Sequence, residues 1–129
     1  VVPVPATGRR EFPLAATQQR LWVLEALDPG NSVYHLCWAV ALAGALSRDA
    51  LQAAVAAVVA RHAVLRTVFV AGEGDAEPCQ RVAATVDVPV EWLAMPGLDA
   101  AGEQALLAAL ARRPFDLATG PLLRVTVLG

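Results

Sequence analysis

Clustered charge, histidine and cysteine are all scarce in this sequence, and each shortage excludes a class of protein. The 129 residues include 10 basic and 12 acidic side chains, and no run of Lys or Arg longer than two. Because nucleic acid is bound through clustered cations, the sequence predicts no nucleic-acid partner. The two cysteines, Cys37 and Cys79, and the two histidines, His35 and His62, lack metal-ligand spacing, so no metal centre is predicted.

Membrane and secretion signals are also missing. The apolar stretches are interrupted by Arg, Asp, Gly and Pro, so no membrane partner is predicted. The first residues do not have the order of a secretory signal, in which a basic segment precedes an apolar one. We therefore expect a cytoplasmic protein in which Cys37 and Cys79 are buried, reduced thiols.

Hydrophobic residues, in contrast, are abundant. They form 57% of the chain while charged residues form only 17%, against about 25% charged residues in a typical soluble domain. Part of this excess is alanine. The rest indicates a surface that another polypeptide normally covers, so we expect the isolated chain to self-associate.

Turn residues divide the chain into helices and strands. Residues 1–11 are predicted to be a linker because they contain Pro3, Pro5 and Gly8. Helices are expected over residues 17–27, 47–62 and 99–113, the last two capped by Ser47 and Asp99. Strands are expected over residues 33–42, 64–70, 79–83, 86–93 and 122–128, with a hairpin between the second and the third. Both faces of residues 33–42 are apolar, which predicts a central, buried strand. The order is typical of an α/β (α+β) fold, a mixed sheet with helices packed on it.

Three segments carry a resemblance to one family. They are FPLAATQQRLWVL (residues 12–24), RHAVLRTVF (residues 61–69) and RRPFDLATGPLLRVTVL (residues 112–128). In order and spacing they resemble three conserved segments of nonribosomal peptide synthetase condensation domains. The first departs from the family pattern at Ala15, where Ser is usual, and at Thr17, where Ala is usual. The lost Ser removes a helix-capping group that Thr17 could replace.

The resemblance implies a fold and an activity. Condensation domains consist of two chloramphenicol-acetyltransferase-like halves, which meet around a tunnel. They join two aminoacyl or peptidyl thioesters carried on the phosphopantetheine arms of peptidyl carrier proteins. Residues 12–129 would be the amino-terminal subdomain, ending before the catalytic HHxxxDG motif. Its partners would be the carboxy-terminal half, carrier proteins and adjacent synthetase domains, with no cofactor bound directly.

Three interpretations of function remain open. The first is part of a peptide-bond-forming enzyme, inactive by itself because HHxxxDG is absent. The second is a half-module that binds carrier proteins or has a structural role without catalysis. The third is a related acyltransferase that uses coenzyme A or carrier-bound donors. All three share the fold, because a fold does not fix a function.

The resemblance also indicates candidate site residues. An arginine of the second segment is expected to pair with the Asp of HHxxxDG; Arg66 is the first choice and Arg61 the second. Arg66 is predicted to lie in an apolar strand, where it would need a carboxylate partner. The alternative is a strand-end arginine that reaches solvent. Further candidates for the tunnel or its motifs, each with an ordinary packing or surface role as the alternative, are Gln18, Arg20, Trp22, Tyr34 and His62.

Overall fold

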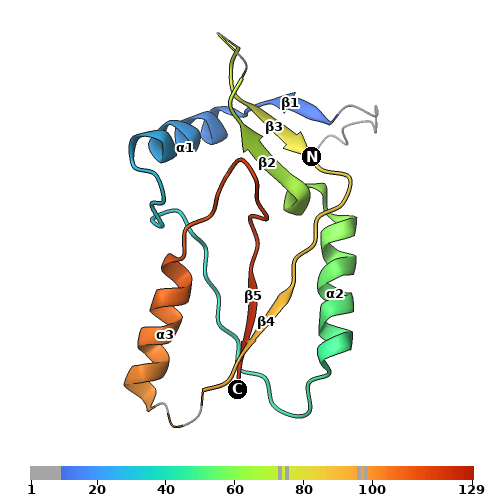
Figure 1. Cartoon of the computed structure of the whole chain (residues 1–129), viewed down its shortest axis with the longest axis vertical. Coiled ribbons are helices and arrows are strands. Elements are labelled where there is room, and N and C mark those ends of the chain that lie inside the picture. The colour runs from blue at the N-terminus through green and yellow to red at the C-terminus, as the bar shows by residue number, and fades with distance from the viewer. Residues whose placement is uncertain (1–9, 73, 75, 96, 98) are drawn as a thin grey trace.

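Helices and short strands make up the fold of the computed structural model, which describes residues 10–72, 74, 76–95, 97 and 99–129 (Figure 1). The elements in chain order are β1 (Glu11–Pro13), α1 (Ala16–Leu27), α2 (Arg48–Arg61), a 3-10 helix (Ala63–Arg66), β2 (Thr67–Val70), β3 (Cys79–Val82), β4 (Val90–Leu93), α3 (Ala100–Arg112) and β5 (Val125–Leu128). The α+β fold predicted from the sequence is confirmed.

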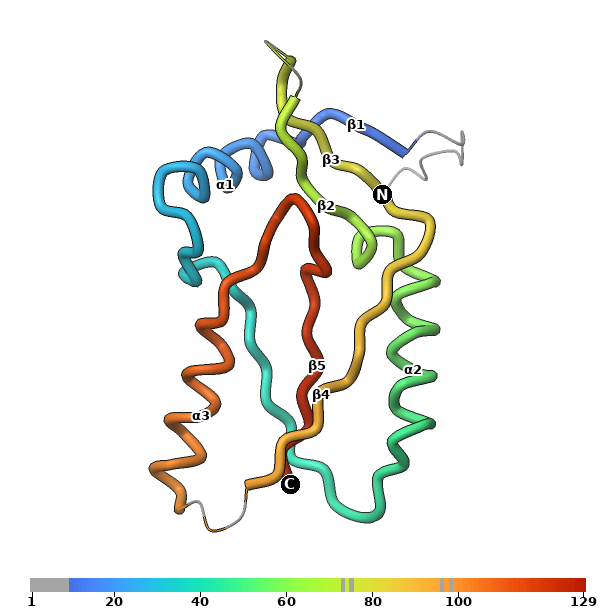
Figure 2. Tube along the Cα trace, in the orientation of Figure 1, coloured from blue at the N-terminus to red at the C-terminus, as the bar shows by residue number. Residues whose placement is uncertain are grey.

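The described strands form two separate sheets. The first has three antiparallel strands in the order β1-β3-β2, with Val70 opposite Cys79 beside the loop that joins β2 to β3. This pairing confirms the predicted hairpin. The second sheet is the parallel pair β4-β5, in which Val90 lies opposite Val125. Figure 2 shows the two sheets at different heights, with β4 and β5 between α2 and α3.

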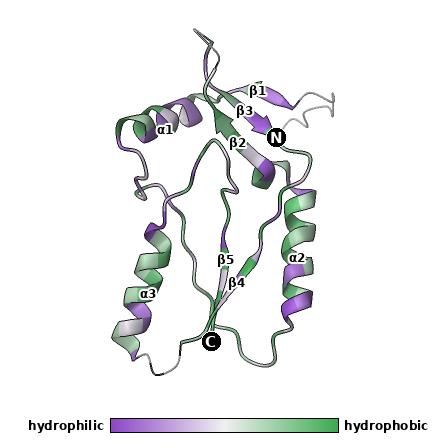
Figure 3. Ribbon diagram, viewed as in Figure 1, coloured by the Kyte–Doolittle hydropathy of each residue, from purple (hydrophilic) through white to green (hydrophobic). Residues whose placement is uncertain are grey.

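Local sequence explains where two of the helices begin. The Ser47 hydroxyl accepts a hydrogen bond from the Ala50 N–H, and the Asp99 carboxylate accepts one from the Gly102 N–H. Both side chains are N-caps, as the sequence predicts. Hydrophobic residues dominate α2 and most of α3 (Figure 3). Val59 of α2 is fully buried, at 1% exposure, and the other buried apolar side chains are Leu14, Val88 and Val90.

The predicted central strand over residues 33–42 is wrong. Val33 and Tyr34 form a turn, and residues 35–42 form an extended segment without strand pairing. Leu36 and Trp38 are each 89% exposed. Cys37 is likewise exposed and Cys79 only partly buried, although both were expected in the core. The physical reason is that no described strand lies beside residues 36–42, so within the described part of the chain no strand covers their faces or pairs with their backbone.

Other element boundaries also differ from the sequence prediction. Residues 63–66 form a 3-10 helix, and the strand expected from residue 64 begins only at Thr67. Strand β4 begins at Val90, directly after Pro89, which has no N–H for a ladder. Residues 1–9 of the predicted linker lie outside the described residues, and Glu11 begins β1. None of the described helices combines the length and apolar character needed to cross a membrane.

Candidate functional site

The first motif segment is joined to the three-stranded sheet. The Gln18 side chain reaches from α1 to β3, where its Nε2 lies 3.5 Å from Gln80 Oε1. Its Oε1 accepts a hydrogen bond of 2.8 Å from the Ala15 N–H. This bond is the Gln half of a capping box, and Ala15 has no side-chain acceptor for the other half. Gln18 therefore supplies one half of the capping box at this helix end.

Arg66 joins the second motif to two neighbouring pieces of backbone. Its guanidinium donates from Nε to the Val59 carbonyl at 3.1 Å and from Nη2 to the Ala60 carbonyl at 3.4 Å, near the end of α2. Its Nη1 donates to the carbonyls of Ala83 and Ala84, which follow β3. Four of its five N–H donors are thus engaged by carbonyl groups, where the sequence had suggested a carboxylate.

The second and third motif segments contact each other directly. The Phe69 N–H donates to the Leu117 carbonyl at 2.7 Å. Gly120 has a positive φ of 61°, and a Cβ there would lie 2.9 Å from a methyl of Val68. Glycine is required at this position on both counts. The motif segments, up to a hundred residues apart, therefore converge on the sheet formed by β1, β2 and β3.

The loop after α3 is held by an aspartate and by an arginine. The Asp116 carboxylate accepts hydrogen bonds from the backbone N–H groups of Ala118 and Thr119, at 2.8 and 3.2 Å. A hydrogen bond from the Thr119 hydroxyl is the largest cause that lowers the pKa of Asp116, and the bonds from these two N–H groups lower it further. Arg124 donates to the carbonyls of Arg113 and Pro114, and its guanidinium stacks 4.0 Å from the centre of the Phe115 ring. Burial and the charge of Arg113 lower the pKa of Arg124.

Glu91 on β4 is the centre of a second polar group. It pairs with Arg113 through two N–O contacts of 2.7 and 3.2 Å, and it accepts a hydrogen bond of 3.3 Å from Thr126 of β5. The guanidinium of Arg113 holds the pKa of Glu91 below its ordinary value, although partial burial opposes this shift. The pair fixes the end of α3 to the parallel strands.

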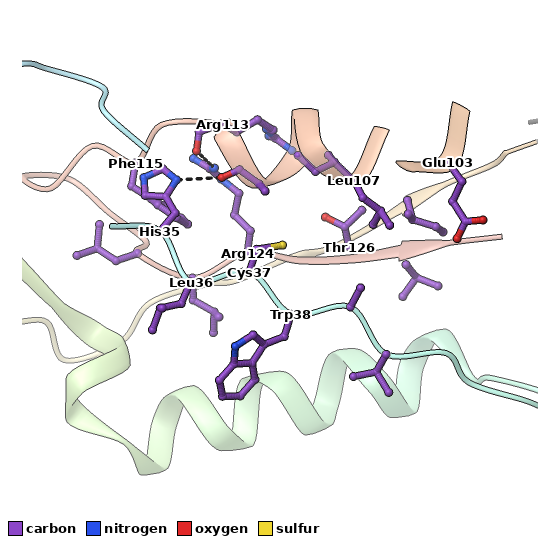
Figure 4. Close-up of a pocket in the computed structure, with 18 of the residues that line it drawn as sticks. His35, Leu36, Cys37, Trp38, Glu103, Leu107, Arg113, Phe115, Arg124 and Thr126 are labelled. Atoms are coloured by element: carbon purple, nitrogen blue, oxygen red, sulfur yellow. Dashed lines mark hydrogen bonds between the residues drawn. The ribbon is translucent and has the colours of Figure 1, made fainter. Parts of the chain in front are cut away.

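A hollow of about 1100 Å³ lies between residues 34–42, α3 and β5. Figure 4 shows His35 and Trp38 pointing to opposite sides of the segment, as alternation along an extended chain requires. The His35 Nδ1 lies 3.1 Å from the Ala111 carbonyl oxygen. The His35 ring packs edge-on against the Phe115 ring, with 5.0 Å between the two ring centres. Because a carbonyl only accepts, Nδ1 is the donor in this contact.

The predicted site residues do not gather in this hollow. Among the seven of them only Tyr34 lines it, and that side chain is 54% exposed. Arg61 and His62 lie at the end of α2 and are exposed, as is Arg20; Gln18 and Trp22 are partly buried. Sequence reasoning gave no role to Arg113 or Glu91. An acidic residue within a strand was the only available signal for Glu91.

Comparison with known proteins decides the family. The sequence profile described as "Condensation domain" matches residues 8–129. The chain belongs to the condensation-domain family. It is 38% identical over 135 residues to phosphinothricin tripeptide synthetase PhsC of Streptomyces viridochromogenes, over 98% of this chain and 12% of that protein. It is 37% identical over 115 residues to tyrocidine synthase 2 of Brevibacillus parabrevis, over 88% of this chain and 3% of that protein.

Solved structures place the condensation-domain fold on the same residues. The starter condensation domain of the rhizomide synthetase RzmA is similar in fold, with a TM-score of 0.80 and 24% identity over 93% of this chain. The match covers only 30% of that chain, so the present chain is a part of a condensation domain. Its sequence contains no two adjacent histidines and therefore no HHxxxDG motif.

Proposed function

We propose that this chain is the amino-terminal part of a domain that forms peptide bonds in nonribosomal peptide synthesis. The substrates would be aminoacyl or peptidyl thioesters on the phosphopantetheine arms of carrier proteins. The observation that carries the proposal is the convergence of the three motif segments around one sheet. Sequence that is shared with peptide synthetases thus builds one connected scaffold, held by Gln18, Arg66 and the Phe69–Leu117 hydrogen bond.

The role of these residues would be to support and shape the site rather than to carry the chemistry. The amine of the acceptor must lose a proton as it attacks the thioester, and the family assigns that step to a histidine of HHxxxDG. No residue of this chain stands in that motif. We therefore expect the 129-residue chain to be inactive alone, and to act together with the carboxy-terminal half, carrier proteins and adjacent synthetase domains in the cytoplasm.

The two candidate arginines would divide their tasks. Arg66 has one N–H left after its four bonds to carbonyl groups, which is too few for a bidentate carboxylate pair. Arg61 is exposed at the end of α2, and no hydrogen bond of its guanidinium is found among the described residues. We propose that Arg66 is a positioning residue for α2 and β3, and that Arg61 is available to pair with the Asp of HHxxxDG.

A domain exchange tests the proposed function. Residues 8–129 would replace the matching segment of a condensation domain of phosphinothricin tripeptide synthetase PhsC, and peptide-bond formation between two carrier-bound aminoacyl thioesters would be measured. The hybrid domain should form the peptide bond, whereas the 129-residue chain alone should not. A hybrid that folds and binds the carrier proteins without forming product would instead favour the non-catalytic role. Product formed only from acyl-coenzyme A would favour the acyltransferase role.

Arginine variants of the hybrid domain test the division of tasks. Arg61→Ala should lower the rate of peptide-bond formation at least tenfold, because the catalytic loop loses its charge partner, while the melting temperature changes little. Arg66→Ala should lower the melting temperature, since hydrogen bonds to a charged group contribute roughly 1.5–3 kcal/mol. Arg61→Lys, which keeps the charge but not the bidentate geometry, is the matched control. A full rate in Arg61→Ala would contradict the role given to Arg61.

A further inference from the structure

One edge of the β4-β5 pair is covered by a side chain of α2. The amide of Gln52 donates from Nε2 to the Val88 carbonyl at 3.1 Å and accepts the Val90 N–H at 2.8 Å. A neighbouring strand would offer the same donor and acceptor to these two backbone groups. Gln52 therefore occupies two hydrogen-bonding positions that an added strand would need.

The two bonds lie on the side of β4 that faces away from β5. The Leu93 carbonyl points toward β5, because it accepts the Gly129 N–H. The direction of the backbone groups alternates along a strand, so those of Val90 and Trp92 point the other way. The bond from the Val90 N–H to Gln52 agrees with this alternation. Gln52 thus covers the outer edge of the sheet.

The sequence of β4 would favour pairing at this outer edge. Residues 88–93 read VPVEWL, and β-branched and aromatic residues favour strands. Proline often protects an edge because it lacks an N–H. By the same alternation, however, the missing N–H of Pro89 lies on the side of β5. Pro89 therefore leaves the outer edge unprotected, and the protection must come from another residue.

A second side chain of α2 brings a positive charge to the same strand. Arg48 lies four residues before Gln52, on the same side of the helix. Its guanidinium stacks 4.4 Å from the centre of the Trp92 ring. Charged side chains at a sheet edge discourage the addition of a strand. The helix thus places a hydrogen-bonded amide at Val90 and a cation at Trp92.

We propose that Gln52 prevents β4 from pairing with the β4 strand of a second copy of this chain. A second copy is the partner that is excluded because an open β4 edge is complementary to itself. Antiparallel pairing about a twofold axis would match N–H groups of one strand with C=O groups of the other. The inference goes beyond the proposed function and does not depend on it.

Hydrogen exchange of individual amides, measured over a range of protein concentrations, tests the proposal. In the wild-type chain the Val90 amide should exchange slowly and at the same rate at every concentration. Gln52→Leu removes both bonds. At the lowest concentration its Val90 amide should exchange roughly tenfold faster, as expected for the loss of one hydrogen bond. The Val90 and Trp92 amides should then become protected together as the concentration rises, because the open edges pair.

Two further variants separate the lost hydrogen bonds from the added apolar surface. Gln104→Leu is the matched control, because Gln104 is exposed on α3 and no hydrogen bond of its amide is found within the described ranges. It should leave the exchange of Val90 unchanged. Gln52→Asn shortens the side chain by one methylene without adding apolar surface, and the shorter amide cannot span both bonds. It should behave like Gln52→Leu, and it provides the same test if Gln52→Leu does not fold.

Three results would overturn the proposal. Wild-type protection of Val90 in both Gln52 variants at the lowest concentration would mean that Gln52 does not protect this amide. Fast exchange that no concentration slows would mean that the open edge does not pair with a second copy. Concentration-dependent protection in Gln52→Leu but not in Gln52→Asn would mean that the apolar side chain causes the association. None of these results bears on peptide-bond formation by the hybrid domain, so the two proposals fail separately.

Discussion

Glu91 and Arg113 form the ion pair with the best geometry in the described structure, because the contact is bidentate and Thr126 adds a third hydrogen bond to the carboxylate. Their side chains are 36% and 44% exposed, so solvent screens the pair and its contribution to stability is modest. The pair is nevertheless the polar link from α3 to both β4 and β5. Its loss should loosen one wall of the hollow.

The lowered pKa of Glu91 gives this link a definite pH dependence. A carboxyl group whose pKa is lower in the folded protein contributes stability above its unfolded value, and that contribution disappears as the pH falls through the folded value. The ordinary value is 4.5, so the loss occurs below that pH. Glu91→Gln should therefore lower the melting temperature by about 1–3 °C at pH 7, and by progressively less on acidification toward pH 3.

Thermal unfolding monitored by circular dichroism across this pH range measures the effect. The matched control is Glu91→Gln in an Arg113→Gln background, where the guanidinium that lowers the pKa is absent. There the substitution should have little effect at any pH. An effect of Glu91→Gln that stays constant from pH 7 to pH 3 would show that the ion pair is not its cause.

At the scale of the elements, α1 begins with half of a capping box. Gln18 satisfies the Ala15 N–H, but Ala15 offers no oxygen to the N–H groups of the first turn. Ala15→Ser would supply this acceptor. The expected gain is about 0.5–2 kcal/mol of stability, which corresponds to a rise of roughly 3–5 °C in melting temperature for each kcal/mol. Ala16→Ser adds the same side chain one position later, where it cannot cap the helix, and should produce no gain. An equal rise in both variants would contradict the capping argument.

The elements also show which features sequence patterns predict and which they do not. The caps Ser47 and Asp99 and the hairpin between β2 and β3 depend on residues close in sequence, and all three were predicted correctly. The strand over residues 33–42 was not, because strand pairing depends on a neighbour that periodicity does not supply. The β-like alternation is still present there, since His35 and Trp38 point to opposite sides.

The candidate site shows the same contrast between features that local sequence predicts and features that depend on distant residues. The three motif segments were recognised from the sequence, and the structure brings them together. The bonds of Arg66 were not foreseen, because the strand expected at residue 64 is a 3-10 helix, which directs the guanidinium to carbonyls of α2 and to the end of β3. The pair between Glu91 and Arg113 joins residues 22 positions apart, and no local pattern indicates it.

At the scale of the whole molecule, the exposed apolar surface is concentrated in one segment. Leu36, Trp38 and Val40 are between 79% and 89% exposed, and they lie beside a backbone without pairing. Such an edge is a template for association with another chain. We expect the isolated 129-residue chain to self-associate through residues 36–42, as its high hydrophobic content first suggested.

Sedimentation velocity over a range of concentrations tests this expectation. Leu36→Lys combined with Val40→Lys should weaken self-association at least tenfold, because a buried Lys without a partner is costly at an interface. The circular dichroism spectrum should not change, since both side chains are already exposed. Leu27→Lys is the matched control, because Leu27 is 76% exposed at the end of α1, away from the segment. If Leu27→Lys weakened association as much, the contact would be general hydrophobic aggregation. If the wild-type chain stayed monomeric at every concentration, water alone would satisfy the backbone N–H and C=O groups of residues 36–42.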